Sequence, residues 1–179
     1  MKQIKLKETM IEILSFLPVI IFSWLLTTFV IANAVVPTGS MESTIMTGSR
    51  LIGNRLAYKG SDPHRKDIVI FKAPDNESIF YVKRIIGLPG DTVEIIQTDS
   101  ESKTGNVYIN GHPIYEDYLN EPMIVEEYMK FEVPKDSYFC MGDNRNKSFD
   151  ARYWENTFVK KDKITAKVLF QYWKGFKKL

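Results

Sequence analysis

The chain has 179 residues, and its 24 basic and 22 acidic side chains give a net charge of +2. This length suffices for one folded domain and a membrane segment, and the balanced charge provides no electrostatic basis for binding nucleic acid. The lone cysteine, Cys140, excludes an intramolecular disulfide, and neither His64 nor His112 has a ligand-like partner at the usual spacing, so we expect no metal site and no cofactor.

The first element along the chain is an uncharged apolar segment, Ile13–Ile31. As a helix this segment extends about 28 Å, which matches the hydrocarbon thickness of a bilayer. Lysines at positions 2, 5 and 7 precede it, and the positive charge that favours the cytoplasmic side of a membrane predicts a cytoplasmic N-terminus. We therefore expect a cytoplasmic segment over residues 1–12, a single transmembrane anchor in the cell membrane over 13–34, and a domain on the outer face over 35–179.

A cleaved signal peptide is the alternative interpretation of this segment. Ala32-Asn33-Ala34 has the small-residue pattern of a cleavage site. The apolar run is longer, however, than the roughly 7–15 residues of a signal-peptide core. We favour an anchor that is retained in the bilayer, and N-terminal sequencing of the isolated protein decides between the two.

After Val36 the sequence changes to short β-type runs separated by turn residues, which predicts a mostly β fold. Asn110-Gly111 is a strong hairpin signal, and the polar segment 98–105 is typical of a surface loop. We expect a smaller β subdomain or insertion over roughly residues 92–135. The expected strands cover residues 50–54, 67–71, 79–86, 92–96, 106–109, 113–115, 128–133, 137–141 and 164–171.

Lys83 lies in the middle of the strongest of these runs, Ile79–Ile86. Both faces of that strand are largely apolar, so we expect it to be covered on both sides. Lys83 and its neighbour Arg84 then either extend to solvent or pair with carboxylates. In the sharper interpretation, burial lowers the pKa of Lys83 toward neutrality, and a neutral lysine amine is a general base.

Ser40 follows the apolar segment closely, within Val36-Pro37-Thr38-Gly39-Ser40-Met41. A serine beside a glycine is often only part of a turn, but a serine paired with a base becomes a nucleophile. A third polar run, Met141–Arg152, follows the strand predicted at 137–141. By itself this run predicts a loop that is held by Asp–Arg pairs.

Taken together and in order, these motifs resemble the bacterial type I signal peptidases, which are membrane-anchored Ser-Lys proteases. Pro37-Thr38-Gly39-Ser40-Met41 resembles the nucleophile box of the family, and Tyr81–Asp91 resembles its lysine box. Arg65–Phe71 is similar to the family's strand box, and Gly142–Arg152 is similar to its final box. The resemblance extends from the anchor to about Trp154. A single anchor and a short exported domain are similar to Gram-positive members.

The resemblance implies an antiparallel β-sheet domain of the signal peptidase and SOS-repressor autoprotease type. It also implies that Ser40 is the nucleophile and Lys83 the general base. Thr38, together with the Ser40 backbone, then stabilises the oxyanion. Ser148 orients Lys83, Asp150 and Arg152 form a supporting ion pair, and Asp143 and Arg145 belong to the scaffold.

The implied activity is the removal of N-terminal signal peptides from exported preproteins, by cleavage after A-x-A-like sites. The implied partners are those preproteins and the lipid bilayer. Small apolar pockets then select the substrate, and the residues expected to line them are Val36, Met41, Ile45, Tyr81 and Val82.

The sequence departs from the family pattern at four positions, one of which is Lys66, where glycine is usual in the strand box. Ser43 replaces a usual proline, Ala151 a frequent serine and Glu155 a common glycine, and none of these removes a catalytic group. An autoprotease like the SOS-response repressors and a catalytically silent, membrane-tethered β module are the alternative functions. The anchor, and the lack of a recognisable helix-turn-helix sequence, favour the signal peptidase.

Overall fold

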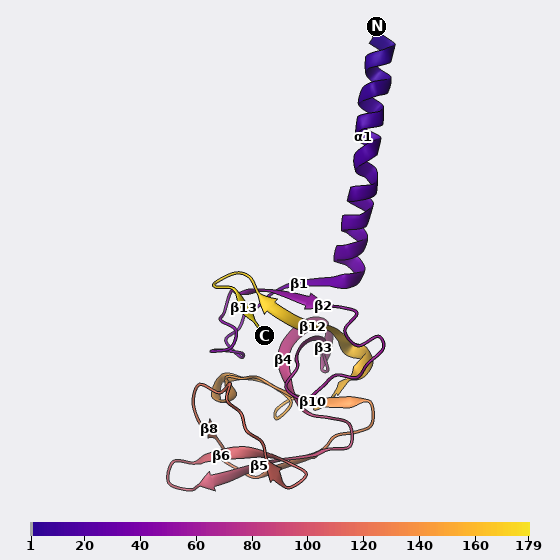
Figure 1. Cartoon of the computed structure of the whole chain (residues 1–179). Coiled ribbons are helices and arrows are strands. Elements are labelled where there is room, and N and C mark those ends of the chain that lie inside the picture. Colours follow the sequence, from indigo (N-terminus) through magenta and orange to yellow (C-terminus); the bar gives the residue numbers. More distant parts are fainter. Residues whose placement is uncertain (1) are drawn as a thin grey trace.

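The N-terminal part of the chain is one long helix that projects from a β-rich domain (Figure 1). A computed structural model describes the backbone of residues 2–179 and the side chains of residues 12–179. Helix α1 spans Lys2–Leu25 and continues as a π-helical turn, η1, over Leu26–Val30. The 19 residues of Glu12–Val30 have a mean hydropathy of 2.2, and none of that stretch is buried against the domain. The predicted N-terminal apolar helix is confirmed.

The predicted anchor range 13–34 is wrong at its C-terminal end. Ile31–Val35 forms strand β1, which pairs antiparallel with β2 (Arg50–Asn54) and sets Ala32 opposite Gly53. An apolar run alone does not distinguish a membrane helix from a buried strand, and β2 supplies the backbone hydrogen bonds that decide the conformation. Ala32-Asn33-Ala34 therefore lies within a paired strand, and cleavage there stays a prediction.

The main sheet is antiparallel and has the strand order β1-β2-β12-β3-β4-β10-β11, with β13 beside β12. Short β-branched runs form its centre, as the sequence predicted. Two 3₁₀ turns lie outside it, η2 (Arg145–Lys147) and η3 (Lys161–Lys163). The remaining strands of this sheet are β3 (Ile68–Ala73), β4 (Asn76–Gly87), β10 (Ser137–Met141), β11 (Val159–Lys160), β12 (Ile164–Gln171) and β13 (Lys177–Lys178).

A second, smaller sheet has the order β7-β6-β5-β9, with β8 beside β6, and lies at the end of the domain remote from α1 (Figure 1). It falls within the predicted 92–135 region, although its independence as a subdomain stays a prediction. Its strands are β5 (Thr92–Asp99), β6 (Thr104–Ile109), β7 (His112–Pro113), β8 (Met123–Ile124) and β9 (Met129–Glu132).

The segment 98–105, predicted as a surface loop, is instead the tip of the β5–β6 hairpin. Gln97 pairs with Gly105 and Asp99 with Thr104, so that only residues 100–103 form the turn. Polar composition suggested a loop, but strands at the rim of a sheet expose both faces and carry polar side chains as well. A Cβ on Gly105 would lie 2.2 Å from the Ile96 carbonyl oxygen, which explains the glycine.

The core consists of two apolar clusters on opposite faces of β3. Val69 and Phe71 point into the first cluster, which continues into the smaller sheet, whereas Ile68 and Ile70 point into the second. The second cluster comprises Ala32, Val36, Met41, Ile45, Leu51, Ile68, Ile70, Ala166 and Val168.

The expectation that Ile79–Ile86 is covered on both faces holds only for its second half. Ile79 and Phe80 are 45% and 55% exposed, whereas Ile85 and Ile86 are fully buried. β10 likewise pairs only with the second half of β4, where Met141 lies opposite Arg84 and Phe139 opposite Gly87. In this sheet the first half of β4 therefore has only β3 as a neighbour, and one of its edges remains free.

Candidate active site

Ser40 lies in the loop that connects β1 to β2, residues 36–49. The loop is closed at its base, where Val36 N donates to Ser49 O over 3.0 Å and Gly48 N donates to Val36 O over 2.7 Å. Met41 and Ile45 anchor it by burying their side chains fully in the second cluster. Ser40 itself is only 8% exposed, so the loop presents a largely desolvated hydroxyl.

Asn144 holds the backbone carbonyl groups of both Gly39 and Ser40. Its side-chain Nδ2 donates to Gly39 O over 2.9 Å, and its backbone N donates to Ser40 O over 3.0 Å. In a planar trans peptide the N–H points away from the preceding carbonyl, so the Ser40 N–H points away from the Gly39 oxygen. The Thr38 hydroxyl lies 3.4 Å from Ser40 Oγ. The site therefore offers two hydrogen-bond donors, the Ser40 N–H and the Thr38 hydroxyl.

Lys83 is buried on β4, opposite Val69 of β3, and is only 4% exposed. Its Nζ donates to the Ser148 hydroxyl over 3.1 Å. Burial of the ammonium group lowers the pKa of Lys83 from 10.5 to about 8, with Arg152 lowering it further and Asp150 opposing the shift. Near physiological pH, Lys83 is therefore a neutral amine in an appreciable fraction of the protein molecules.

The segment 142–152 bridges the serine loop and the lysine. Lys83 lies on the same face of β4 as Ile85 of the first cluster, whereas the serine loop packs on the second cluster. Gly142 lies where they approach, because a Cβ there would come within 2.4 Å of Ser40 O and 2.2 Å of Ser148 Oγ. The same segment thus holds Ser40 through Asn144 and Lys83 through Ser148.

Asp150 and Arg152 shape this bridging segment. Arg152 Nε donates to Asp150 Oδ1 over 2.8 Å in a buried ion pair, and Asp150 Oδ2 accepts from Gly142 N over 2.9 Å. Arg152 Nη2 also donates to Arg145 O over 2.6 Å. These bonds cross-link the two ends of the bridging segment.

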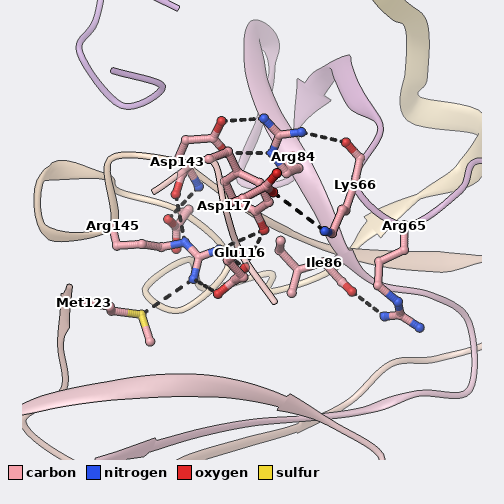
Figure 2. Close-up of polar contacts among 12 residues, drawn as sticks. Arg65, Lys66, Arg84, Ile86, Glu116, Asp117, Met123, Asp143 and Arg145 are labelled. Atoms are coloured by element: carbon pink, nitrogen blue, oxygen red, sulfur yellow. Dashed lines mark hydrogen bonds and ion pairs between the residues drawn. The ribbon is translucent and has the colours of Figure 1, made fainter. Parts of the chain in front are cut away.

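Two further ion pairs, shown in Figure 2, attach the bridging segment to its surroundings. Arg84 donates to both carboxylate oxygens of Asp143, over 2.8 and 2.6 Å. Arg145 is paired with Glu116. Arg84 thus takes a carboxylate partner rather than extending to solvent, which is one of the two outcomes that the sequence left open.

The residues predicted to line the substrate pockets fall into two groups. Val36, Met41 and Ile45 belong to the second cluster, and Val82 packs against it. Tyr81 lies on the opposite face of β4, where it stacks on Trp154 at 5.7 Å between ring centroids. The four aliphatic side chains therefore lie together, and Tyr81 lies apart from them, on the side of Lys83.

Sequence reasoning missed the contributions of Gly142, Asn144 and Trp154. Gly142 and Asn144 were part of the motif match, but nothing in the sequence indicated that they contact the serine loop. Thr47 Oγ1 donates a hydrogen bond to Glu42 Oε1 over 2.7 Å. No pattern in the sequence indicated this bond. Among residues 2–179, no group of three His, Cys, Asp or Glu side chains is arranged to hold a metal ion.

A desolvated serine, adjacent donors and a lysine with a lowered pKa form a site that can perform acyl transfer. Comparison with known proteins agrees, because residues 9–173 match the family model described as signal peptidase, peptidase S26. The chain is 39% identical over 151 residues to a probable signal peptidase I-2 of Synechocystis sp. (82% of this chain). It is 34% identical over 178 residues to a signal peptidase I P of Bacillus subtilis subsp. natto, covering 94% of this chain and 92% of that protein. The chain therefore belongs to the signal peptidase family, peptidase S26, and the family resemblance is confirmed.

The relatives differ in how much of their length this chain spans. The match covers 65% of the Synechocystis protein and 64% of a signal peptidase I of Pseudomonas aeruginosa. A crystal structure of a signal peptidase I from Enterococcus faecalis V583 is 34% identical, with a TM-score of 0.48 over 60% of this chain and 97% of that one.

Proposed function

We propose that this chain is a membrane-bound serine endopeptidase that removes signal peptides from exported preproteins and cuts after A-x-A-like sites. The observation that carries the proposal is the buried Lys83, whose lowered pKa and bond to Ser148 prepare it as a base. Because the chain belongs to the signal peptidase family, we assign this base to the hydrolysis of a peptide bond.

The proposed mechanism uses the neutral amine of Lys83 twice. Ser40 Oγ attacks the carbonyl carbon before the scissile bond and gives its proton to Lys83 Nζ. The oxyanion accepts hydrogen bonds from the Ser40 N–H and the Thr38 hydroxyl. The resulting ammonium group then donates its proton to the leaving amine, which departs as the C–N bond breaks. Neutral Lys83 next takes a proton from water, which attacks the acyl-enzyme, and Lys83 returns that proton to Ser40 Oγ as the acid product leaves.

Two free strand edges support recognition of an extended substrate. β1 ends the strand order of the main sheet, and the first half of β4 pairs only with β3 there. An extended peptide can add to such an edge through backbone hydrogen bonds. Of the aliphatic group, Val36 follows β1 directly and Val82 lies on β4, and we place the pocket for small side chains such as alanine beside these two residues.

The apolar helix fits a single-pass membrane protein. In the proposed topology the lysines at positions 2, 5 and 7 remain in the cytoplasm and the catalytic domain lies on the outer face. Because β1 follows the helix directly, the serine loop would stay near the membrane surface, where the cleavage sites of exported preproteins emerge.

Cleavage of a preprotein with an A-x-A site by the detergent-solubilised full chain tests the proposal. The wild-type protein is expected to cut after the last alanine, and Ser40→Ala is expected to reduce the rate to background because no other hydroxyl replaces the nucleophile. Mass spectrometry of the two products locates the cut. Undiminished cleavage by folded Ser40→Ala would show that the activity does not reside in this site.

Thr38→Val is expected to lower kcat/KM by about 10²–10³-fold, the usual consequence of removing one oxyanion donor. Valine has nearly the same shape, so folding is expected to be retained and KM to change little. The matched control is Thr98→Val on the exposed end of β5, which should retain wild-type rates. Wild-type kcat/KM in Thr38→Val would remove Thr38 from the oxyanion site.

A further inference from the structure

A cavity of about 610 Å³ lies between the smaller sheet and the bridging segment. The sheet contributes Ile95, Ile124 and Met129, together with Glu126 and Glu127, and the bridging segment contributes Ser148 among others. None of the four aliphatic residues assigned to the substrate pockets lines it. The cavity is therefore separate from the pockets proposed to bind the residues before the cut.

Ser148 fixes the position of this cavity relative to the proposed reaction. It lines the cavity and its hydroxyl accepts the hydrogen bond from Lys83 Nζ. In the proposed mechanism Lys83 protonates the leaving amine, which belongs to the residue after the scissile bond. The cavity consequently adjoins the leaving-group side of the site, in the direction in which the mature protein continues.

The lining suits an amphipathic cation. Ile95 is buried at the floor, Met129 is half-buried and Ile124 is 51% exposed, so apolar surface is available. The exposed carboxylates of Glu126 and Glu127 lie at the rim. A lysine or arginine side chain can lay its aliphatic stem on such a floor while its charge reaches the carboxylates.

The positive charges in the same wall are already neutralised. Arg145 is paired with Glu116, and Arg152 with Asp150, and in each pair both side chains are largely buried. Glu126 and Glu127 therefore determine the charge that an occupant meets. An acidic side chain would find no free cation among these two arginines, whereas a basic one would find two carboxylates.

The walls are held together before any ligand binds. Asn146 Oδ1 accepts from Ile124 N over 2.9 Å, and Asn146 Nδ2 donates to Glu121 Oε1 and Pro122 O over 3.0 Å each. Arg145 also reaches Met123 Sδ at 3.8 Å, as Figure 2 shows. The bridging segment and the smaller sheet are thus cross-linked at β8 and at the two residues before it.

We propose that this cavity binds the first few residues of the mature protein after the cut and selects a lysine or arginine among them, through Glu126 and Glu127. The inference rests on the proposed peptidase function. It assigns to the smaller sheet a role in substrate choice that the Ser-Lys chemistry does not require.

Peptides that share one A-x-A site and differ only in carrying lysine or glutamate at each of the first three positions after it test the proposal. The wild-type protein is expected to show a kcat/KM about five-fold higher for lysine at one or more positions, in line with the modest strength of exposed charge pairs. The double variant Glu126→Lys/Glu127→Lys is expected to reverse the preference. The control Glu155→Lys/Asp162→Lys makes the same change of charge at two exposed positions that line a different cavity, and it should leave the preference unchanged.

Binding to the inactive Ser40→Ala protein separates this proposal from the proposed function. Fluorescence anisotropy of the labelled peptides should show the same preference for lysine, and its reversal in the Glu126→Lys/Glu127→Lys background. Equal binding of lysine and glutamate peptides would overturn the subsite even if the wild type cleaves both. Selective binding by Ser40→Ala, together with no cleavage of either peptide by the wild-type protein, would retain the subsite and contradict the peptidase function.

Discussion

Lys83→Met is expected to reduce kcat/KM for an A-x-A substrate by about 10²–10⁴-fold or more, the contribution usual for a positioned general base. Methionine has a similar length and an apolar end, so it fits a site where the lysine is 4% exposed. Because burial disfavours the ammonium group, its removal should leave the free energy of unfolding unchanged or raised. Circular dichroism and thermal unfolding of the variant check that the loss is catalytic.

The pH dependence gives a second measure of the same group. Only neutral Lys83 accepts the serine proton, so kcat/KM of the wild type is expected to rise with pH, with a midpoint at the Lys83 pKa of about 8. Below that pH the amine is protonated and the rate falls tenfold per pH unit. A lysine with its ordinary pKa of 10.5 would place the midpoint more than two units higher.

Lys83→Met is the control for this profile, because its residual activity should lack the rise near pH 8. Undiminished cleavage by the variant, or the same rise in it, would assign the base to another residue. The two histidines would then be reconsidered, although both His64 and His112 are exposed.

Gly142→Ala is the second substitution with a large expected effect, about 10²-fold or more in kcat/KM. The new Cβ would lie 2.2 Å from Ser148 Oγ and 2.4 Å from Ser40 O, and atoms cannot approach so closely. Either Ser148 moves away from Lys83 or the Ser40 backbone shifts, and a displacement of about 1 Å can cost 10²-fold in rate. The loss should appear mainly in kcat, because the atoms nearest to the new Cβ belong to Ser40 and Ser148 rather than to the aliphatic pocket residues.

Gly60→Ala is the matched control, because a Cβ on Gly60 meets nothing within 4 Å. It should retain the wild-type rate, and thermal unfolding of both variants separates misplacement of the site from general instability. Full activity in Gly142→Ala would contradict the close approach of Ser40 and Ser148 to Gly142.

Much of the site could be predicted from local sequence because the motifs are contiguous. The bond between Ser148 and Lys83 and the pair Asp150–Arg152 both match what the family resemblance implied. Asn144 and Gly142 could not be assigned, since their contacts with the serine loop join segments about 100 residues apart in the chain. The family resemblance grouped Tyr81 with Val82, yet alternation along β4 sends the two to opposite faces.

The sequence by itself determined the apolar helix, the positions of most strands, the serine and lysine motifs and the family, because each depends on residues that are neighbours in the chain. The tertiary structure alone decided that Ile31–Val35 joins the sheet, that one edge of β4 stays free and that Gly142 lies between Ser40 and Ser148. It also decided the lowered pKa of Lys83. These features arise from burial and pairing between distant segments, and a local pattern contains no information about which distant segment will supply the partner or exclude the water.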